Sequence, residues 1–263
     1  MDIVTAGTIA YVGKQLLGKT FDVISSDIAG LYTSGRNKII QKATEKIKNK
    51  DDGKSANLRV ARDVFWNGSF TDEAICAEYF GGILASSRSD DGKDDSGIYY
   101  VDLMKSLSSK QLTLHYIFYF LLNKILVSKP EKNEMSIGDE SKLQSEKLLI
   151  SINELKTILN SDLGRDLHAL HAKGLIGYLK TDNFVLKNKR LVPYLEIAPK
   201  SLGVQLYAVA HNKMEDWAKF NTIDFGKFDD INVPNFYGNN IEELLKKAGI
   251  KDEEPAEVLQ EKN

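Results

Sequence analysis

The fold is decided by residues 148–211, LLISINELKTILNSDLGRDLHALHAKGLIGYLKTDNFVLKNKRLVPYLEIAPKSLGVQLYAVAH. Short apolar runs in this stretch predict strands, and segments whose leucines recur every three or four residues predict helices. Asn153 is placed to cap the first helix, and Gly174 to end the second. In chain order we expect a strand at 148–152, helices at 153–159 and 162–173, strands at 175–179 and 195–197, and a last helix opened by Pro199.

A polar segment, Lys180–Arg190, separates the last two predicted strands and is expected to form a loop. A strand, two helices and a strand pair joined by a basic loop follow one another in a winged helix-turn-helix, which binds a duplex or another protein. We therefore predict a mainly α protein. Its parts are an N-terminal helical domain, 1–107, a winged helix-turn-helix domain with a small β wing, 108–215, and a C-terminal part, 216–263, with an aromatic arm, a short helix and a frayed acidic tail.

Composition and charge are those of an ordinary globular protein. The 263 residues are 42% hydrophobic and 27% charged, and a net charge of -2 gives no global attraction to nucleic acid or anionic lipid. Cys76 is the only cysteine, so no disulfide can form within one chain, and a cytoplasmic location is expected. The longest apolar run, His115–Val127, is too short to span a bilayer, so we expect no membrane insertion.

The flanking segments predict further helices and two irregular stretches. Ser108 is placed to cap a long helix that ends at Val127. A helix over 36–50 is expected to keep its basic side chains outside and its apolar ones, Ile39, Ile40, Ala43 and Ile47, inside. The remaining expectations are helices at 57–66, 72–88, 98–107 and 241–248, a mobile loop at 128–147, and an arm at 220–237 that packs on the body or on a partner.

One motif suggests nucleotide binding. GKQLLGKT, residues 13–20, matches the phosphate-binding pattern in which backbone amides cradle phosphates. Gly13 and Gly18 would shape the loop, Lys19 would contact the terminal phosphates, and Thr20 would hold magnesium. The apolar run 98–101 before Asp102 offers a partner aspartate. Such a site needs a parallel sheet, and few strands are predicted before residue 148, so nucleotide binding remains an alternative.

Basic residues of the predicted winged module are candidates for binding phosphates. They are Lys180, Lys187, Lys189 and Arg190 in the wing and Arg165 on the second helix. Asp162 and Asp166 lie among the helix residues, however, and acids that face a duplex repel it. DNA binding is therefore one hypothesis beside a protein-binding or self-associating module.

No arrangement for metal binding or catalysis emerges from the sequence. His168 and His171 have the spacing of helical metal ligands, but no third ligand is near them in sequence. The acidic loop 90–95 lacks the spacing and the closing glutamate of a calcium-binding loop. Four histidines and one cysteine leave little for nucleophilic catalysis. We predict no catalytic residue, no metal and no cofactor.

Three stretches, taken together, are similar to a known family. LLGKTFDVISSDI (16–28), FTDEAICAEYFGGILASS (70–87) and YYVDLMKSLS (99–108) resemble segments of the Abi-alpha family of bacterial abortive-infection proteins. Relatives often carry a His-Pro pair where this chain has Ile98-Tyr99, which is a departure. The resemblance covers about the first half of the chain. It implies a mostly helical bacterial protein with a role in phage defence, and it carries over no catalytic residues.

The sequence thus leads to one main hypothesis and two alternatives. The main hypothesis is a non-enzymatic component of antiviral defence that acts through protein interaction by its winged module, with a protein partner or a second copy of the chain. The first alternative is a DNA-binding transcriptional regulator. The second is a phosphate-loop nucleotide-binding protein.

Overall fold

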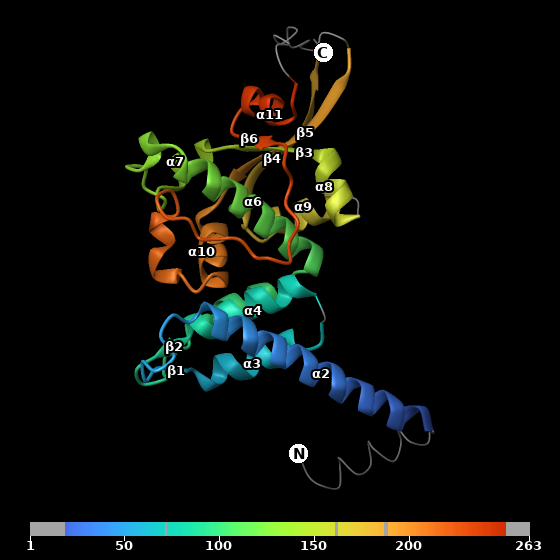
Figure 1. The fold of residues 1–263 in the computed structure, drawn as a ribbon, viewed down its shortest axis with the longest axis vertical. Helices are drawn as coiled ribbons and strands as arrows, with labels where there is room; N and C mark the ends of the chain where they lie inside the picture. Colours follow the sequence, from blue (N-terminus) through green and yellow to red (C-terminus); the bar gives the residue numbers. More distant parts are fainter. Residues whose placement is uncertain (1–18, 72, 161–162, 187–188, 251–263) are drawn as a thin grey trace.

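The computed structural model describes residues 19–71, 73–160, 163–186 and 189–250, which form a mainly helical fold with a four-stranded antiparallel sheet (Figure 1). The helices are α2 (Lys19–Lys46), α3 (Leu58–Gly68), α4 (Ala74–Ser86), α5 (Gly97–Met104), α6 (Ser109–Val127), α7 (Glu140–Ser145), α8 (Ile152–Leu159), α9 (Leu163–Ala172), α10 (Ser201–Ala210) and α11 (Ile241–Lys247), with 3-10 turns η1 (Pro130–Lys132) and η2 (Met214–Lys219). The strands are β1 (Ser55–Ala56), β2 (Arg88–Ser89), β3 (Leu148–Ser151), β4 (Ile176–Val185), β5 (Leu191–Pro199) and β6 (Tyr237–Gly238).

Helix α4 is the centre of the N-terminal half. It is apolar on nearly every side, and α2, α3 and α5 pack around it. The C-terminal turns of α2 bury Ile39 and Ala43 against it, while the N-terminal turns of α2 extend past the body (Figure 1). The predicted inside position of Ile40 is wrong, since 43% of this residue is exposed.

Helix α6 is the centre of the C-terminal half. Its predicted cap is confirmed: the Ser108 hydroxyl accepts from the Gln111 backbone N–H, and the Gln111 side chain accepts from the Ser108 N–H. Thirteen of its 19 residues are buried, because the sheet and α9 pack beside it and both α10 and α4 pack against it. A helix that is apolar all round is stable only when it is enclosed in this way.

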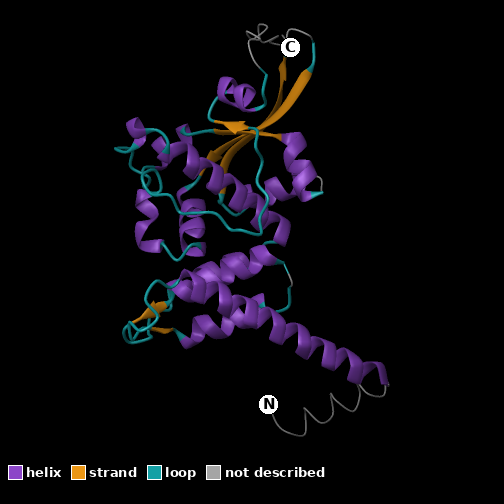
Figure 2. Ribbon diagram, in the orientation of Figure 1, coloured by secondary structure: helices purple, strands orange, loops and turns teal. Residues whose placement is uncertain are grey.

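The sheet has the strand order β4-β5-β3-β6, and all of its neighbours run antiparallel. The predicted loop 180–190 is wrong for most of its length, because β4 continues to Val185 and pairs with β5 as far as Leu191 (Figure 2). Pro199 ends β5 rather than opening α10, which begins at Ser201. Ser151, not Asn153, caps α8, since its hydroxyl accepts from the Glu154 backbone N–H.

The two halves meet where α4 crosses α10 (Figure 1). Gly82 lies so close to α10 that a Cβ there would be 2.2 Å from the carbonyl oxygen of Ala210. The apolar core is continuous across this contact, from Ile39 in α2 to Ile231 in the arm.

The segment 128–147, predicted as a mobile loop, contains η1 and α7. It is held by Asn221, whose side-chain amide donates to the carbonyls of Lys132, Asn133 and Met135. The predicted arm 220–237 is extended and packs on the body, with Phe220, Phe225 and Phe228 buried.

Candidate functional site

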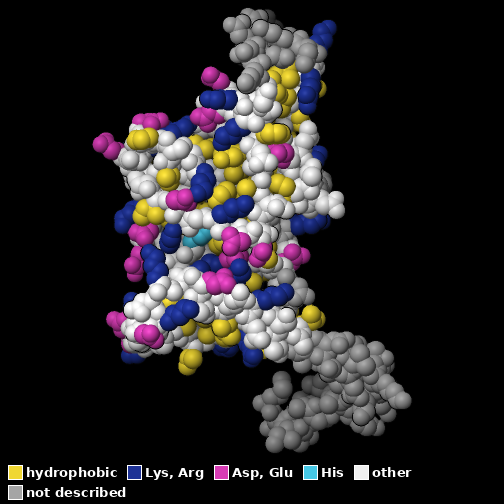
Figure 3. Space-filling view, in the orientation of Figure 1, with side chains coloured by type: hydrophobic (Ala, Val, Ile, Leu, Met, Phe, Trp, Pro, Cys, Tyr) yellow, Lys and Arg dark blue, Asp and Glu magenta, His cyan; other side chains and the backbone are white. Residues whose placement is uncertain are grey.

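A basic face is formed by α8, α9 and the β4–β5 hairpin. Arg165, His168 and His171 are exposed on α9, and Lys156 is exposed on α8. Lys180, Lys189 and Arg190 are exposed on the hairpin, along which Figure 3 shows basic side chains, whereas Lys187 lies outside the described residues. Residues 152–190 contain seven Lys or Arg and four Asp or Glu, a net charge of +3 in a chain whose total is -2.

Asp166 does not face solvent, and its predicted repulsion of a duplex is therefore wrong, whereas Asp162 lies outside the described residues. The residue is 2% exposed because it lies three residues after Leu163 and four before Leu170, on the buried face of α9. The Gln111 side-chain amide donates to its Oδ1 at 3.0 Å, while its Oδ2 is buried without a hydrogen bond among the described residues. The exposed face of α9, within its described residues, thus carries basic side chains and no acid.

The hairpin carries two acids close to its basic residues: Asp182 on β4, and Glu196 on β5, which lies opposite Lys180 in the strand register. Lys180 Nζ lies 2.5 Å from Asp182 Oδ2, and this ion pair lowers the pKa of Asp182 and raises that of Lys180. At the tip, the Leu186 N–H donates to the Arg190 carbonyl, and the Lys189 N–H donates to the Leu186 carbonyl. These bonds fix the turn that holds the basic tip residues at the far end of the hairpin.

The nucleotide-binding motif gains no support from the described fold. Gly13 and Gly18 lie outside the described residues, and Lys19 and Thr20 are the first residues of α2. The run 98–101 is part of α5, so Asp102 does not follow a strand. Neither sheet among the described residues is parallel.

The residues considered for metal binding and nucleophilic chemistry do not form a common site among the described residues. Within the described part of the chain, no three His, Cys, Asp or Glu side chains are grouped so as to hold a metal ion. Cys76 is buried in α4, where desolvation raises its thiol pKa to about 11.

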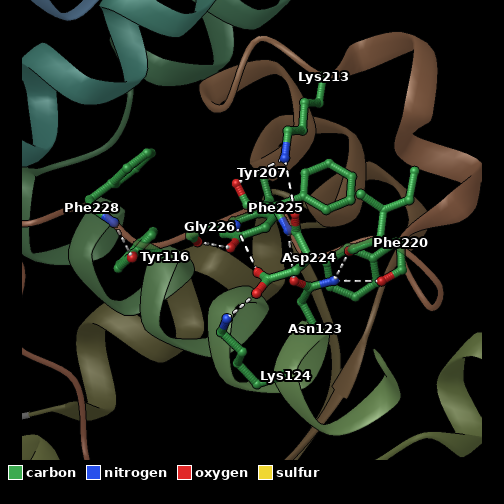
Figure 4. Close-up of polar contacts among 11 residues, drawn as sticks. Tyr116, Asn123, Lys124, Tyr207, Lys213, Phe220, Asp224, Phe225, Gly226 and Phe228 are labelled. Carbon is green, nitrogen blue, oxygen red and sulfur yellow. Dashed lines mark hydrogen bonds and ion pairs between the residues drawn. The ribbon is translucent and has the colours of Figure 1, made fainter. Parts of the chain in front are cut away.

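The docking site of the arm was not predicted from the sequence. Asn123 of α6 donates through its side-chain amide to the carbonyls of Phe220 and Ile223, and its Oδ1 accepts from the Phe225 N–H (Figure 4). Its neighbour Lys124 lies 2.5 Å from Asp224, and this contact lowers the pKa of that carboxyl group. An Asn inside the apolar run 115–127 was the available signal, because a buried amide needs partners.

Tyr116 and Tyr207 complete this docking site. The Tyr116 hydroxyl accepts from the Phe228 N–H at 2.7 Å, and the Tyr207 hydroxyl donates to the Gly226 carbonyl at 3.4 Å (Figure 4). Gly226 has a φ of 94°, which favours glycine. Because these bonds fix backbone atoms, the irregular arm takes one path over the body.

A buried ion group joins the arm to the N-terminal helices. Glu78 of α4 is 3% exposed and contacts the ammonium groups of Lys42 and Lys46, so these two lysines do not lie outside as predicted. Burial lowers the pKa of Lys46, whose ammonium group lies 4.8 Å from the centre of the Phe228 ring.

Two histidines, His115 and His211, are buried in the core. The Nε2 of His115 donates to the Gly203 carbonyl, so its Nδ1 accepts from the Tyr79 hydroxyl, and burial lowers the His115 pKa to about 3. His211 stacks on Phe228, and desolvation also lowers its pKa. Both imidazoles are therefore neutral near pH 7, and their contacts are those of core residues.

Comparisons with protein-family models, curated proteins and solved structures found no match for this chain. No helix among the described residues combines the length and apolar character needed to cross a bilayer.

Proposed function

We propose that the protein binds duplex DNA through a winged helix-turn-helix made of α6, β3, α8, α9 and the β4–β5 hairpin. The support is the element order together with the sheet order, in which β5 lies between β4 and β3. In a winged helix-turn-helix, the second helix of the pair contacts the duplex. That helix is α9 here, and the hairpin would contact the phosphates beside it.

The single observation that carries this proposal is the burial of Asp166. With its carboxylate turned towards α6, the outward face of α9 presents Arg165, His168 and His171. Basic side chains on α8 and at the hairpin tip extend this face, and phosphate contacts supply most of the non-specific affinity for DNA. The low net charge of the whole chain does not oppose this, because the attraction is local.

The test is a salt titration of duplex binding by fluorescence anisotropy. The logarithm of the association constant should fall linearly with the logarithm of salt concentration, with a slope of about -0.9 for each phosphate contact. Arg165→Glu and Lys189→Glu should each lower the affinity at least about tenfold and make the slope less steep by about one. Lys93→Glu reverses a charge that is 82% exposed in the N-terminal half and should leave binding unchanged. Absence of binding by the wild-type protein at low salt would refute the proposal.

A second candidate function is a component of antiviral defence that acts by binding a protein. The resemblance of the first half to Abi-alpha proteins suggests it, and a specific feature favours it: large apolar side chains are exposed on α2, α3 and α5 in that half. Its test is phage plating on cells that express the gene with its native neighbours. Unchanged plating across a broad phage panel would remove its main support.

A further inference from the structure

Exposed large apolar side chains are concentrated on the N-terminal helices. Trp66 is 68% exposed on α3, Leu31 is 47% exposed on α2, and Phe70 is 46% exposed just after α3. Single exposed apolar residues are normal on protein surfaces, whereas contiguous ones mark interaction sites. The other exposed large apolar side chains among the described residues are Ile40, Leu58 and Tyr99 in the same half and Tyr178, Val185 and Leu191 on the hairpin.

Two of these N-terminal side chains, Trp66 and Phe70, form one connected patch with the half-buried Tyr32. The ring centres of Trp66 and Phe70 are 5.9 Å apart in an edge-to-face arrangement, and those of Phe70 and Tyr32 are 5.5 Å apart. We call Trp66, Phe70 and Tyr32 the aromatic patch. Because the rings already contact one another, they lose little conformational freedom when a partner covers them.

Two arginines of α3 beside the aromatic patch are paired with acids. Arg59, Arg62 and Trp66 recur at spacings of three and four, which places them on one face of α3. Arg62 Nε lies 2.6 Å from Asp63, and Arg59 Nη1 lies 3.0 Å from Asp95. These two pairs therefore add no net charge to this face of α3.

We propose that the aromatic patch is the contact surface of a homodimer. A two-fold axis places a surface against the same surface of the second copy. If the residues around the patch all had the same charge sign, the two copies would therefore repel each other. Arginines next to aspartates avoid this repulsion, because Arg62 of one copy can face Asp63 of the other. The central residues suit the role as well, since Trp, Tyr, Phe and Arg are enriched in interface cores. The inference depends on neither proposed function, because a monomer could still bind DNA or a different protein.

The test is sedimentation equilibrium of the full chain over a range of micromolar concentrations. The wild-type protein should associate reversibly into dimers, and Trp66→Ser combined with Phe70→Ser should weaken the association at least about tenfold. Tyr178→Ser combined with Leu191→Ser removes two apolar side chains of similar exposure from the hairpin and should leave the dimer intact. Far-UV circular dichroism should be the same for all of these proteins, because every substituted side chain is exposed.

A charge substitution tests the orientation of the two copies. Arg62→Glu places an acid beside Asp63 in both copies and should weaken the dimer, and adding Asp63→Arg should restore it, because the opposite charges then face each other again. A wild-type protein that stays monomeric at high micromolar concentration would overturn the proposal. A dimer that persists without the Trp66 and Phe70 rings would also overturn it, because another surface would then form the contact.

Discussion

Replacing Gly82 with alanine should destabilise the protein, although alanine is the better helix former. The added Cβ would lie 2.2, 2.4 and 2.5 Å from the carbonyl oxygen, the carbonyl carbon and the Cα of Ala210. These are main-chain atoms of α10, so no side-chain rotation can relieve the contact. An ordinary contact of about 3.4 Å requires α4 and α10 to separate locally by about 1 Å.

The size of the effect follows from two opposing terms. Separation by about 1 Å forfeits up to half of the dispersion attraction at each affected contact, and overpacking of this kind costs about 3 kcal/mol, the upper end of the usual range. The higher helix propensity of alanine stabilises the folded state by about 1 kcal/mol relative to glycine. The free energy of unfolding should therefore fall by about 2 kcal/mol, which lowers Tm by roughly 4–8 °C in a chain of this size.

Thermal unfolding followed by circular dichroism measures this change, with Gly30→Ala as the matched control. Gly30 is likewise inside a helix, α2, but no atom lies within 4 Å of its added Cβ. The Tm of Gly30→Ala should therefore equal that of the wild-type protein or be slightly higher. The only two tryptophans, Trp66 on α3 and Trp217 in η2, report on the two halves separately. Fluorescence of single-tryptophan variants should show both halves unfolding together at the lowered temperature. An unchanged Tm in Gly82→Ala would refute the close contact between α4 and α10.

Two further predictions concern buried polar groups. Burial lowers the pKa of His115 to about 3, against about 6.5 in the unfolded chain. Between these two pH values the unfolded state therefore binds more protons than the folded state. The free energy of unfolding should fall by up to about 1.4 kcal/mol for each pH unit as the pH drops from about 6.5 to about 3. Urea titrations at several pH values should show a smaller pH dependence of the unfolding free energy for His115→Gln than for the wild-type protein. The control His168→Gln, at an exposed position, should keep the wild-type pH dependence. The same pH dependence in both variants would contradict the reasoning. Asn123→Ala removes three hydrogen bonds to the arm and should lower the free energy of unfolding by at least about 3 kcal/mol. Limited proteolysis should cut this variant within 220–237 faster than the control Asn183→Ala, which changes an exposed residue. A proteolysis rate equal to that of the wild-type protein would show that Asn123 does not hold the arm.

The sequence predicted elements whose side-chain pattern directly reflects burial. Helices α6, α8, α9 and α11 lie within a few residues of their expected bounds, because their apolar residues recur at helical spacing. The outer half of the hairpin was missed because both of its faces are largely exposed, so Lys180–Asn183 show no alternation. Backbone pairing with β5 forms that part of the strand, and side-chain patterns do not report on it.

The candidate basic face was predicted as a set of residues, but its electrostatic character was not. Arg165, Lys180, Lys189 and Arg190 are exposed as expected. From the sequence, Asp166 was expected on the duplex-facing surface together with Arg165, because both lie on the same short helix. Whether a carboxylate faces solvent depends on the rotation of α9 against α6, which the positions of Leu163, Leu167 and Leu170 set. Counting charges along a helix therefore misjudges a surface when one of the charges is on the core side.

Polar residues inside apolar stretches mark the places where distant segments meet. Asn123, Glu78 and Asp166 each interrupt a buried face, and each is bound by a side chain or backbone that is distant in sequence. A buried polar group without a partner costs free energy, so the sequence alone requires that some partner exists. It does not say which one, because an amide is satisfied equally well by any carbonyl that reaches it. The path of the arm follows from that choice: once Asn123 binds Phe220 and Phe225, the next turns of the chain bring Phe228 to Lys46 and so join the arm to the N-terminal helices.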